Sequence, residues 1–381
     1  MFYTHNSSIR NLIRRAIMVF ASLAMIIGLS ACSDESKVAK VDGKSGSTNV
    51  VKAQIVLKVG YDGVAGEPLD LGMQRWKEEL ENRTHGRISL ELYPSASLGE
   101  KNSILERMQQ GEHLATVVDG ASLYAMGAYD LGVLYGPYLF NNWDEALRLV
   151  DSKWTKAQFD KLSREHNIRV ISFDWCYGVR HLLTTRPITK FSELQGLRIR
   201  TPMNDIQYRT WQTFGTEPTK MPATKVLAAL RNKEIDAVER PIATIYAGGF
   251  YKAASYLLKT AHVYDLSGVA VSNAFWQSLS TSDQEIFKQS CDRAAKFFNV
   301  VQMAEEHAAL KHLIAAGVTV TEPSPQFFRD INTAARSFYA RRDVSEHWTP
   351  GLYYQTVNAK TVPWSYYTGN GLDPETGSLK K

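Results

Sequence analysis

Residues 282–317 read SDQEIFKQSCDRAAKFFNVVQMAEEHAALKHLIAAG, and this stretch predicts one uninterrupted helix. Ser282 with Glu285 is typical of a capping box that starts a helix, and Gly317 is typical of a residue that ends one. Apolar residues recur between them at alternating spacings of four and three, which places them on one helical face: Phe287, Cys291, Ala294, Phe298 and Val301. A helix of roughly 34 residues is about 50 Å long. Because this exceeds the width of one small lobe, we expect the helix to lie across two.

The chain before this helix carries two groups of alternating strand and helix patterns. In the first group, strand patterns alternate with helical ones over 54–61, 69–86, 87–93, 100–110 and 114–118. In the second group, they alternate over 168–173, 197–201, 205–214, 223–231 and 235–238. Alternation of this kind predicts parallel sheets with helical crossovers. Since about fifty residues separate the groups, we expect an α/β protein with two lobes rather than one continuous sheet.

The composition is that of an ordinary globular protein. Of the 381 residues, 44% are hydrophobic and 22% are charged, which excludes wholesale disorder and a collagen-like fibre. The chain has 44 Lys and Arg residues against 39 Asp and Glu residues, and the basic residues are scattered. Scattered basic residues do not form the patch that binds a nucleic acid, so no nucleic-acid partner is expected.

The first 31 residues have the pattern of a bacterial lipoprotein signal peptide. Arg10, Arg14 and Arg15 precede an apolar run over residues 16–31, and the run ends in Leu-Ser-Ala before Cys32. Small residues before a cysteine resemble the lipobox, in which the cysteine is lipidated and becomes the new N-terminus. We expect cleavage before Cys32, with an uncleaved N-terminal anchor helix as the alternative.

This leader predicts a lipid-anchored protein of the periplasm or cell envelope. Residues 32–53 are rich in Ser, Lys, Asp and Gly, a composition that favours a flexible tether. Removing the three arginines of residues 1–31 leaves 41 basic residues against 39 acidic ones. Because the mature chain is then nearly neutral, the placement of its positive charges matters more than their number.

Motifs for catalysis, cofactors and metals are missing from the sequence. It contains no GxSxG, HExxH, P-loop or strand-linked GxGxxG motif, so we predict neither an enzyme nor a cofactor. His307 and His312 are five residues apart and do not share a helical face, so no metal site is predicted. Cys176 and Cys291 could form a disulfide, but Cys291 fits the apolar face of the long helix, which favours a buried free thiol.

Two arginines give the stronger functional signal. Arg180 lies in the segment 178–188, and Arg200 lies in FSELQGLRIRTP over residues 191–202. The planar guanidinium presents parallel N–H donors that suit a carboxylate. Spacing alone favours a solvated surface charge for any single arginine.

The segments around these arginines resemble the substrate-binding proteins of tripartite ATP-independent periplasmic (TRAP) transporters. The matching pieces are NRTHGRI at 82–88, LYPS at 92–95, Leu98-Gly99, residues 191–202, and AALRNKEIDAVERP at 228–241. They occur in the family's order and spacing over residues 54–340.

The resemblance implies a two-lobed periplasmic-binding-protein-like fold with a long helix across both lobes. We expect lobe I to comprise residues 54–177 and about 266–300, and lobe II residues 178–265 and about 301–340. Residues 341–381 would form a tail that packs on the lobes. Its aromatic residues could instead mark a partner surface: Trp348, Tyr353, Tyr354, Trp364, Tyr366 and Tyr367.

The resemblance also implies a function. A receptor of this kind binds an organic acid between its lobes and delivers it to the TRAP membrane permease. Arg200 occupies the position of the family's principal carboxylate clamp, and Arg180 that of an assisting arginine. The alternative is a sensory or interaction lipoprotein with the same fold; an enzyme ranks last because no catalytic constellation was found.

Three departures from the family pattern bear on the ligand. Arg240 stands where the family usually has Asn, and it either faces the cleft or turns outward to the rim. Ala223 replaces an aromatic wall, which indicates a roomier pocket or a wall from elsewhere, with candidates Trp175, Tyr177 and Trp211. Asp119 aligns loosely with a family carboxylate that meets ligand hydroxyls or amines, with a solvated loop acid as the equal alternative.

Overall fold

A computed structural model describes residues 54–361. Its strands form a nine-stranded sheet in the order β2-β1-β3-β8-β4-β7-β5-β6, with β9 pairing to β8. The strands are β1 (Ile55–Gly60), β2 (Ile88–Tyr93), β3 (Leu114–Asp119), β4 (Ile168–Thr184), β5 (Arg198–Thr201), β6 (Glu217–Lys220), β7 (Ala237–Pro241), β8 (Tyr256–Ser272) and β9 (Thr319–Thr321).

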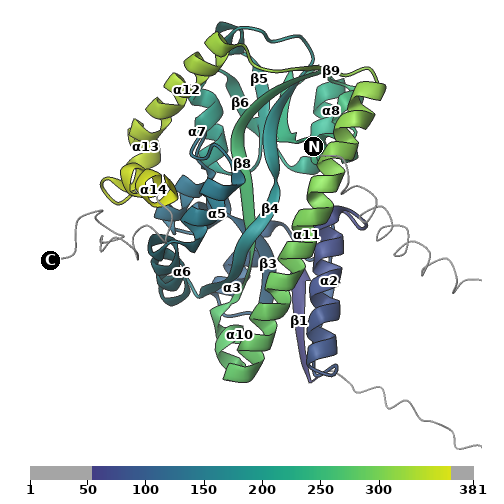
Figure 1. The fold of residues 1–381 in the computed structure, drawn as a ribbon, viewed down its shortest axis with the longest axis vertical. Coiled ribbons are helices and arrows are strands. Elements are labelled where there is room, and N and C mark those ends of the chain that lie inside the picture. Colours follow the sequence, from purple (N-terminus) through teal and green to yellow (C-terminus); the bar gives the residue numbers. More distant parts are fainter. Residues whose placement is uncertain (1–53, 362–381) are drawn as a thin grey trace, which may run out of the picture. The chain divides into compact units, whose positions relative to one another are not determined.

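Helices cover both faces of this sheet (Figure 1). The α-helices are α2 (Pro68–Arg83), α3 (Lys101–Gln109), α4 (Gly120–Ala125), α5 (Trp143–Asp151), α6 (Lys153–Glu165), α7 (Asp205–Thr213), α8 (Val226–Arg231), α9 (Ile242–Ala247), α10 (Asn273–Ser278), α11 (Thr281–Ala315), α12 (Pro325–Ala340), α13 (Arg342–Ser345) and α14 (Leu352–Thr361). Four 3₁₀ helices complete the set: η1 (Tyr129–Tyr135), η2 (Phe191–Leu194), η3 (Ala223–Lys225) and η4 (Phe250–Lys252).

The prediction of an α/β fold with two lobes is confirmed. Strands β1, β2 and β3 run parallel in one lobe, and β5, β6 and β7 run parallel in the other. The prediction that the lobes do not share a continuous sheet is wrong. Strands β4 and β8 are 17 residues long each, pair with one another, and carry the hydrogen bonding from one lobe into the other. Polar residues such as Asp174 interrupt the apolar pattern of β4, which is why the sequence predicted its end at Phe173.

The long helix is confirmed as α11, and its N-cap differs from the prediction. Ser280, rather than Ser282, has an extended backbone and accepts a hydrogen bond from Asp283 N over 3.1 Å. Phe287 and Phe298 of α11 are buried in the core beside β1 and β3. Ala309, further along the same helix, is buried in the core around β7 and α9. One helix therefore contributes to the cores of both lobes, and Figure 1 shows it beside α2 at one end and near α8 at the other.

The described part of the predicted tail, residues 341–361, packs on the rest of the chain. Trp348 and Leu352 are buried beside Phe338 of α12. Thr349 bonds Asp130 through its N–H and its hydroxyl, at 2.8 and 2.6 Å.

The predicted signal peptide, the lipidated Cys32, the tether and the last twenty residues lie outside the described residues. Within residues 54–361, no helix combines the length and apolarity that a bilayer crossing requires.

Candidate functional site

The carboxyl ends of β3 and β7 lie on either side of one short segment of β4. Asp119 ends β3 and pairs with Ser267 of β8, which also pairs with Trp175 of β4. Pro241 ends β7 and pairs with Arg180 of β4. In open α/β sheets, ligands bind at the carboxyl ends of strands. The region around residues 175–180 is therefore the candidate site, and most of the sequence-predicted residues lie in it.

Arg180 is buried and fully engaged by other side chains. Its Nε–H donates to Glu239 Oε2 over 2.5 Å, and Nη2 donates to Glu239 Oε1 and to the Glu239 carbonyl oxygen over 2.8 and 2.9 Å. Its Nη1 donates to Asp265 Oδ2 over 2.7 Å and to the hydroxyl of Tyr135 over 3.1 Å. These bonds use all five N–H donors of a guanidinium. In this state Arg180 organises the site without presenting a free donor to a ligand.

The acids around Arg180 form one charged cluster. Burial alone would raise the pKa of Glu239, but the charge of Arg180 and the hydrogen bonds from Arg180 and His262 hold it at about 2. Burial raises the pKa of Asp265, against the opposing charge of Arg180. The carboxylates of Glu239 and Asp265 thus both bond the guanidinium of Arg180, which explains why its donors are not available to a ligand.

Arg200 is also buried but is left open. Only 2% of the residue is exposed, and its Nε–H donates to the main-chain oxygen of Met221 over 2.9 Å. Its Nη1 is buried, and no atom of residues 54–361 forms a hydrogen bond with it. Burial and the nearby positive charge of Arg240 lower the pKa of Arg200, with Glu239 opposing. Since leaving a buried donor unpaired costs roughly 1–3 kcal/mol, this guanidinium favours an added acceptor.

Arg240 lies close enough to Arg200 and Tyr177 for its charge to influence the pKa of each. Its Nε is buried and, among the described residues, has no hydrogen-bond partner. The sequence left two orientations open for this side chain, and an orientation toward the ligand is part of the proposal below. Arg200 and Arg240 are thus two neighbouring positive charges, each with one buried nitrogen that lacks a hydrogen-bond partner within residues 54–361.

Lys101 is a site residue that sequence reasoning missed. Its Nζ lies 3.0 Å from Asp119 Oδ2 and 4.0 Å from a carboxylate oxygen of Asp62. The charge of Lys101 and the N–H of Ser122 lower the pKa of Asp119 although burial opposes them. Asp119 is also the N-cap of α4, so it is a bonded acid rather than a solvated loop acid. Lys101 begins the helix α3 that follows β2, and it is distant in sequence from both acids, so no spacing pattern pointed to it.

The aromatic candidates divide between core and cavity. Trp175 is 1% exposed and packs against Phe298 with ring centroids 5.1 Å apart. Trp211 is fully buried against Phe214 and His262. Tyr177 is half-buried and lines a cavity of about 320 Å³ between the loop at residues 65–69, α9 and α11. Of the three, Tyr177 alone borders open space in this state, while Ala223 lies exposed in η3.

Both described cysteines are free. Cys291 Sγ lies 3.4 Å from the hydroxyl of Ser172, and Cys176 Sγ lies 3.9 Å from the carbonyl oxygen of Asp174. The free-thiol prediction is confirmed for this pair.

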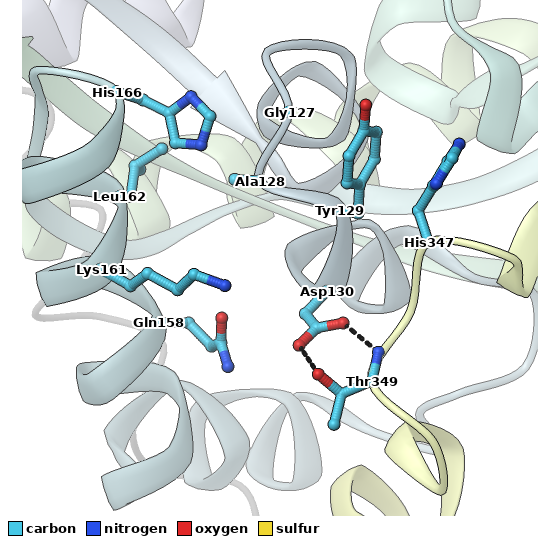
Figure 2. Close-up of a pocket in the computed structure, with 10 residues that line it drawn as sticks. All are labelled: Gly127, Ala128, Tyr129, Asp130, Gln158, Lys161, Leu162, His166, His347 and Thr349. Carbon is cyan, nitrogen blue, oxygen red and sulfur yellow. Dashed lines mark hydrogen bonds between the residues drawn. The ribbon is translucent and has the colours of Figure 1, made fainter.

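A second, smaller cavity of about 70 Å³ lies elsewhere (Figure 2). It is bordered by His166, Lys161, Tyr129 and His347, with the last two rings stacked at 4.5 Å. None of the sequence-predicted site residues lines it. It is therefore separate from the arginine site.

Comparisons with known proteins show which proteins the chain is similar to. The model of the family described as bacterial extracellular solute-binding protein, family 7, matches residues 60–343. A TRAP periplasmic solute-binding protein from Ochrobacterium anthropi, solved with L-fuconate, is 29% identical; the match has a TM-score of 0.75 and covers 81% of this chain and 100% of that one. A TRAP periplasmic solute-binding protein from Actinobacillus succinogenes, solved with L-galactonate, is 30% identical, with a TM-score of 0.73 and coverages of 80% and 99%.

A curated relative is also a periplasmic binding protein. The sialic acid-binding periplasmic protein of Vibrio cholerae is 25% identical over 280 residues, which cover 74% of this chain and 87% of that protein.

Proposed function

The chain belongs to bacterial extracellular solute-binding protein family 7, the periplasmic receptors of TRAP transporters, and from this premise we propose that it binds a hydroxylated organic acid through Arg200 and Arg240. As a member of this family it is a solute receptor rather than an enzyme. The ligand, its clamp and its delivery to a permease are our proposals.

One observation carries the proposal: within the described part of the chain, the buried Arg200 has an Nη1 without a hydrogen-bond partner, whereas Arg180 has no free donor. A carboxylate at Arg200 would pair the open donor and offset the repulsion from Arg240. A charge-assisted hydrogen bond contributes about 1.5–3 kcal/mol net. Arg180 then acts as the buried support that holds Glu239 and strand β7 beside the ligand.

The opposite side of the site favours a ligand with hydroxyl groups. Lys101 and Asp119 offer a donor and an acceptor at the end of β3. Sugar acids combine one carboxylate with several hydroxyls, and the solved relatives hold L-fuconate and L-galactonate. We therefore propose a sugar acid as the ligand class.

The remaining parts of the proposal concern the cell envelope. We propose that the chain is anchored through a lipid on Cys32 and hands its ligand to the TRAP membrane permease. The second candidate is a sensory or interaction lipoprotein with the same ligand site. Co-purification distinguishes them, because a receptor of the first kind associates with permease subunits and the second kind does not.

Acid-dependent thermal stabilisation tests the ligand class. We expect L-fuconate, L-galactonate or L-gulonate to raise the melting temperature, since a ligand that binds only the folded state stabilises it. The matched neutral sugars L-fucose, L-galactose and L-gulose are expected to have no effect. Equal stabilisation by acids and neutral sugars would refute a carboxylate clamp.

A further inference from the structure

Three polar side chains of α11 face the irregular part of β4. Asn299, Gln302 and Glu306 are three and four residues apart, which places them on one side of the helix. Val300 and Met303, between them, are 68% and 59% exposed, so the polar side chains are those turned toward the sheet. Polar groups in such a position require partners, and each of the three has one.

Asn299 and Gln302 replace the hydrogen bonds that β4 lacks at its bulge. The pairing of β4 with β8 shifts register between Cys176 and Gly178, where Gly178 has φ +135°. Asn299 Oδ1 accepts from Cys176 N, and Asn299 Nδ2 donates to the main-chain oxygen of Asp174, both over 2.8 Å. Gln302 Nε2 donates to the main-chain oxygen of Tyr177, also over 2.8 Å.

Glu306 binds the start of α9 in the same way. Its two oxygens accept from the N–H groups of Ile242 and Ala243 over 3.1 and 3.2 Å. Gln302 Nε2 also donates to Glu306 Oε1 over 3.2 Å, which joins the hydrogen bonds to β4 with those to the start of α9. A Cβ at Gly178 would lie 2.8 Å from Glu306 Oε1 and 2.7 Å from the ring of Pro241, so only glycine lets the segments approach this closely.

We propose that Asn299, Gln302 and Glu306 form one hinge brace, which positions the two ligand-facing segments. The brace fixes β4 at Tyr177 and fixes the start of α9, two residues after Arg240, beside the bulge in the pair of strands that links the lobes. This inference rests on the proposed function for the roles of Tyr177 and Arg240. Its residues act through these two, so they are positioning residues.

Gln302, the central member of the brace, gives the sharpest test. The brace protects the amides of Cys176, Ile242 and Ala243 through Asn299 and Glu306, and Gln302 itself bonds none of them. We compare Gln302→Met, which removes the donor at similar size, with Met303→Gln, the reverse change at the exposed neighbouring position. Residue-resolved hydrogen exchange of the full mature protein measures the amides of Cys176, Ile242 and Ala243. We expect Gln302→Met to accelerate all three by about tenfold, the scale of one lost hydrogen bond. Met303→Gln is expected to leave them unchanged.

A second pair of variants tests rescue. Glu306→Leu is expected to accelerate exchange at Cys176 as well as at Ile242 and Ala243. Glu306→Gln keeps one acceptor oxygen, so it is expected to retain the protection of Cys176 and of one of the Ile242 and Ala243 amides. A local role would change only the amides that Glu306 itself bonds. Unchanged exchange in Gln302→Met, acceleration confined to one segment, or equal acceleration at amides of β1 and β2 would overturn the brace.

A measurement of ligand binding in the same variants separates this inference from the proposed function. In the same variants, the affinity for L-galactonate is measured by titration calorimetry, and we expect Gln302→Met to weaken it about tenfold while Met303→Gln does not. If the wild type bound none of L-galactonate, L-fuconate and L-gulonate, the proposed function would fail. The exchange experiment, which needs no ligand, would still decide the brace.

Discussion

Arg200 donates its Nε–H to the main-chain oxygen of Met221 over 2.9 Å, and this single bond aims its buried guanidinium. The bond fixes one edge of the side chain, while Nη1 has no hydrogen-bond partner among the residues that the structure describes. An arginine that is anchored but incompletely paired is preorganised for an anion, because little rotamer entropy remains to be lost on binding.

The Arg180–Glu239 pair is expected to dominate the stability of the site. Removing one partner of a buried ion pair costs roughly 3–5 kcal/mol, since the other charge stays buried. Glu239→Gln should therefore lower the free energy of unfolding by about that amount, measured by urea denaturation. Glu234→Gln, at an exposed position in the loop between α8 and β7, is the control and should change it by less than about 0.5 kcal/mol.

The same pair predicts how stability depends on pH. The pKa of Glu239 is about 2 in the folded protein, below the ordinary value of 4.5. Its contribution is therefore present above pH 4.5 and is lost as the pH falls toward 2. The stability difference between wild type and Glu239→Gln should shrink over that range, and a constant difference would show that the pair is not the cause.

The raised pKa of Glu306 predicts that stability falls as the pH rises toward neutral, opposite to the effect of Glu239. Burial, with a contribution from Glu305, raises the pKa of Glu306 to about 7 against the hydrogen bonds from Ala243, Ile242 and Gln302. A raised carboxyl pKa gives stability that is present below pH 4.5 and is lost as the pH rises through 7. Relative to Glu306→Gln, the wild type should lose stability between pH 5 and pH 8. Parallel curves for the two proteins would place the pKa of Glu306 elsewhere.

Arg240 is expected to set a preference for doubly charged acids. With Arg200 it provides two positive groups with free donors, so galactarate, a dicarboxylate, should bind more tightly than galactonate. Arg240→Asn, which restores the family's usual residue, should weaken galactarate binding more than galactonate binding, as measured by calorimetry. If the substitution affected both acids equally, Arg240 would contribute only general attraction.

The two described cysteines are expected to resist alkylation. Burial raises the pKa of the Cys176 thiol to about 12 and also raises that of Cys291. Because the thiolate is the reactive form, iodoacetamide at pH 8 should modify neither in the native protein and both in urea. Peptide mass mapping assigns the sites, and rapid native labelling of Cys176, which is half-buried, would contradict its raised thiol pKa.

The sequence predicted the parts of the fold that depend on periodicity. The apolar spacing along α11 and the strand–helix alternation are local patterns, and both lobes follow from them. The continuous sheet was missed because β4 bends through bulges that break its alternation. When the sequence of one segment is considered alone, a bulge inside a long strand looks like the point at which the strand ends.

The site was predicted in outline and differs in how its arginines are used. The resemblance pointed to Arg180 and Arg200 alike, yet only the fold shows that Asp265, 85 residues after Arg180, takes one of its donors. Such long-range partners leave no spacing signal. The pairing of Lys101 with Asp119 was hidden for the same reason, since it depends on β2 and β3 lying on either side of β1.

The most direct test of the account is calorimetric titration of Arg200 variants with the sugar acid that stabilises the wild type most. Arg200→Met should lose at least about a hundredfold in affinity, the scale of two charge-assisted hydrogen bonds, and Arg200→Lys should retain weak binding at most. Arg198→Met, two residues earlier on β5 and paired with Asp236 at 2.6 Å, is the control and should bind normally. Wild-type affinity in Arg200→Met would contradict the arginine clamp.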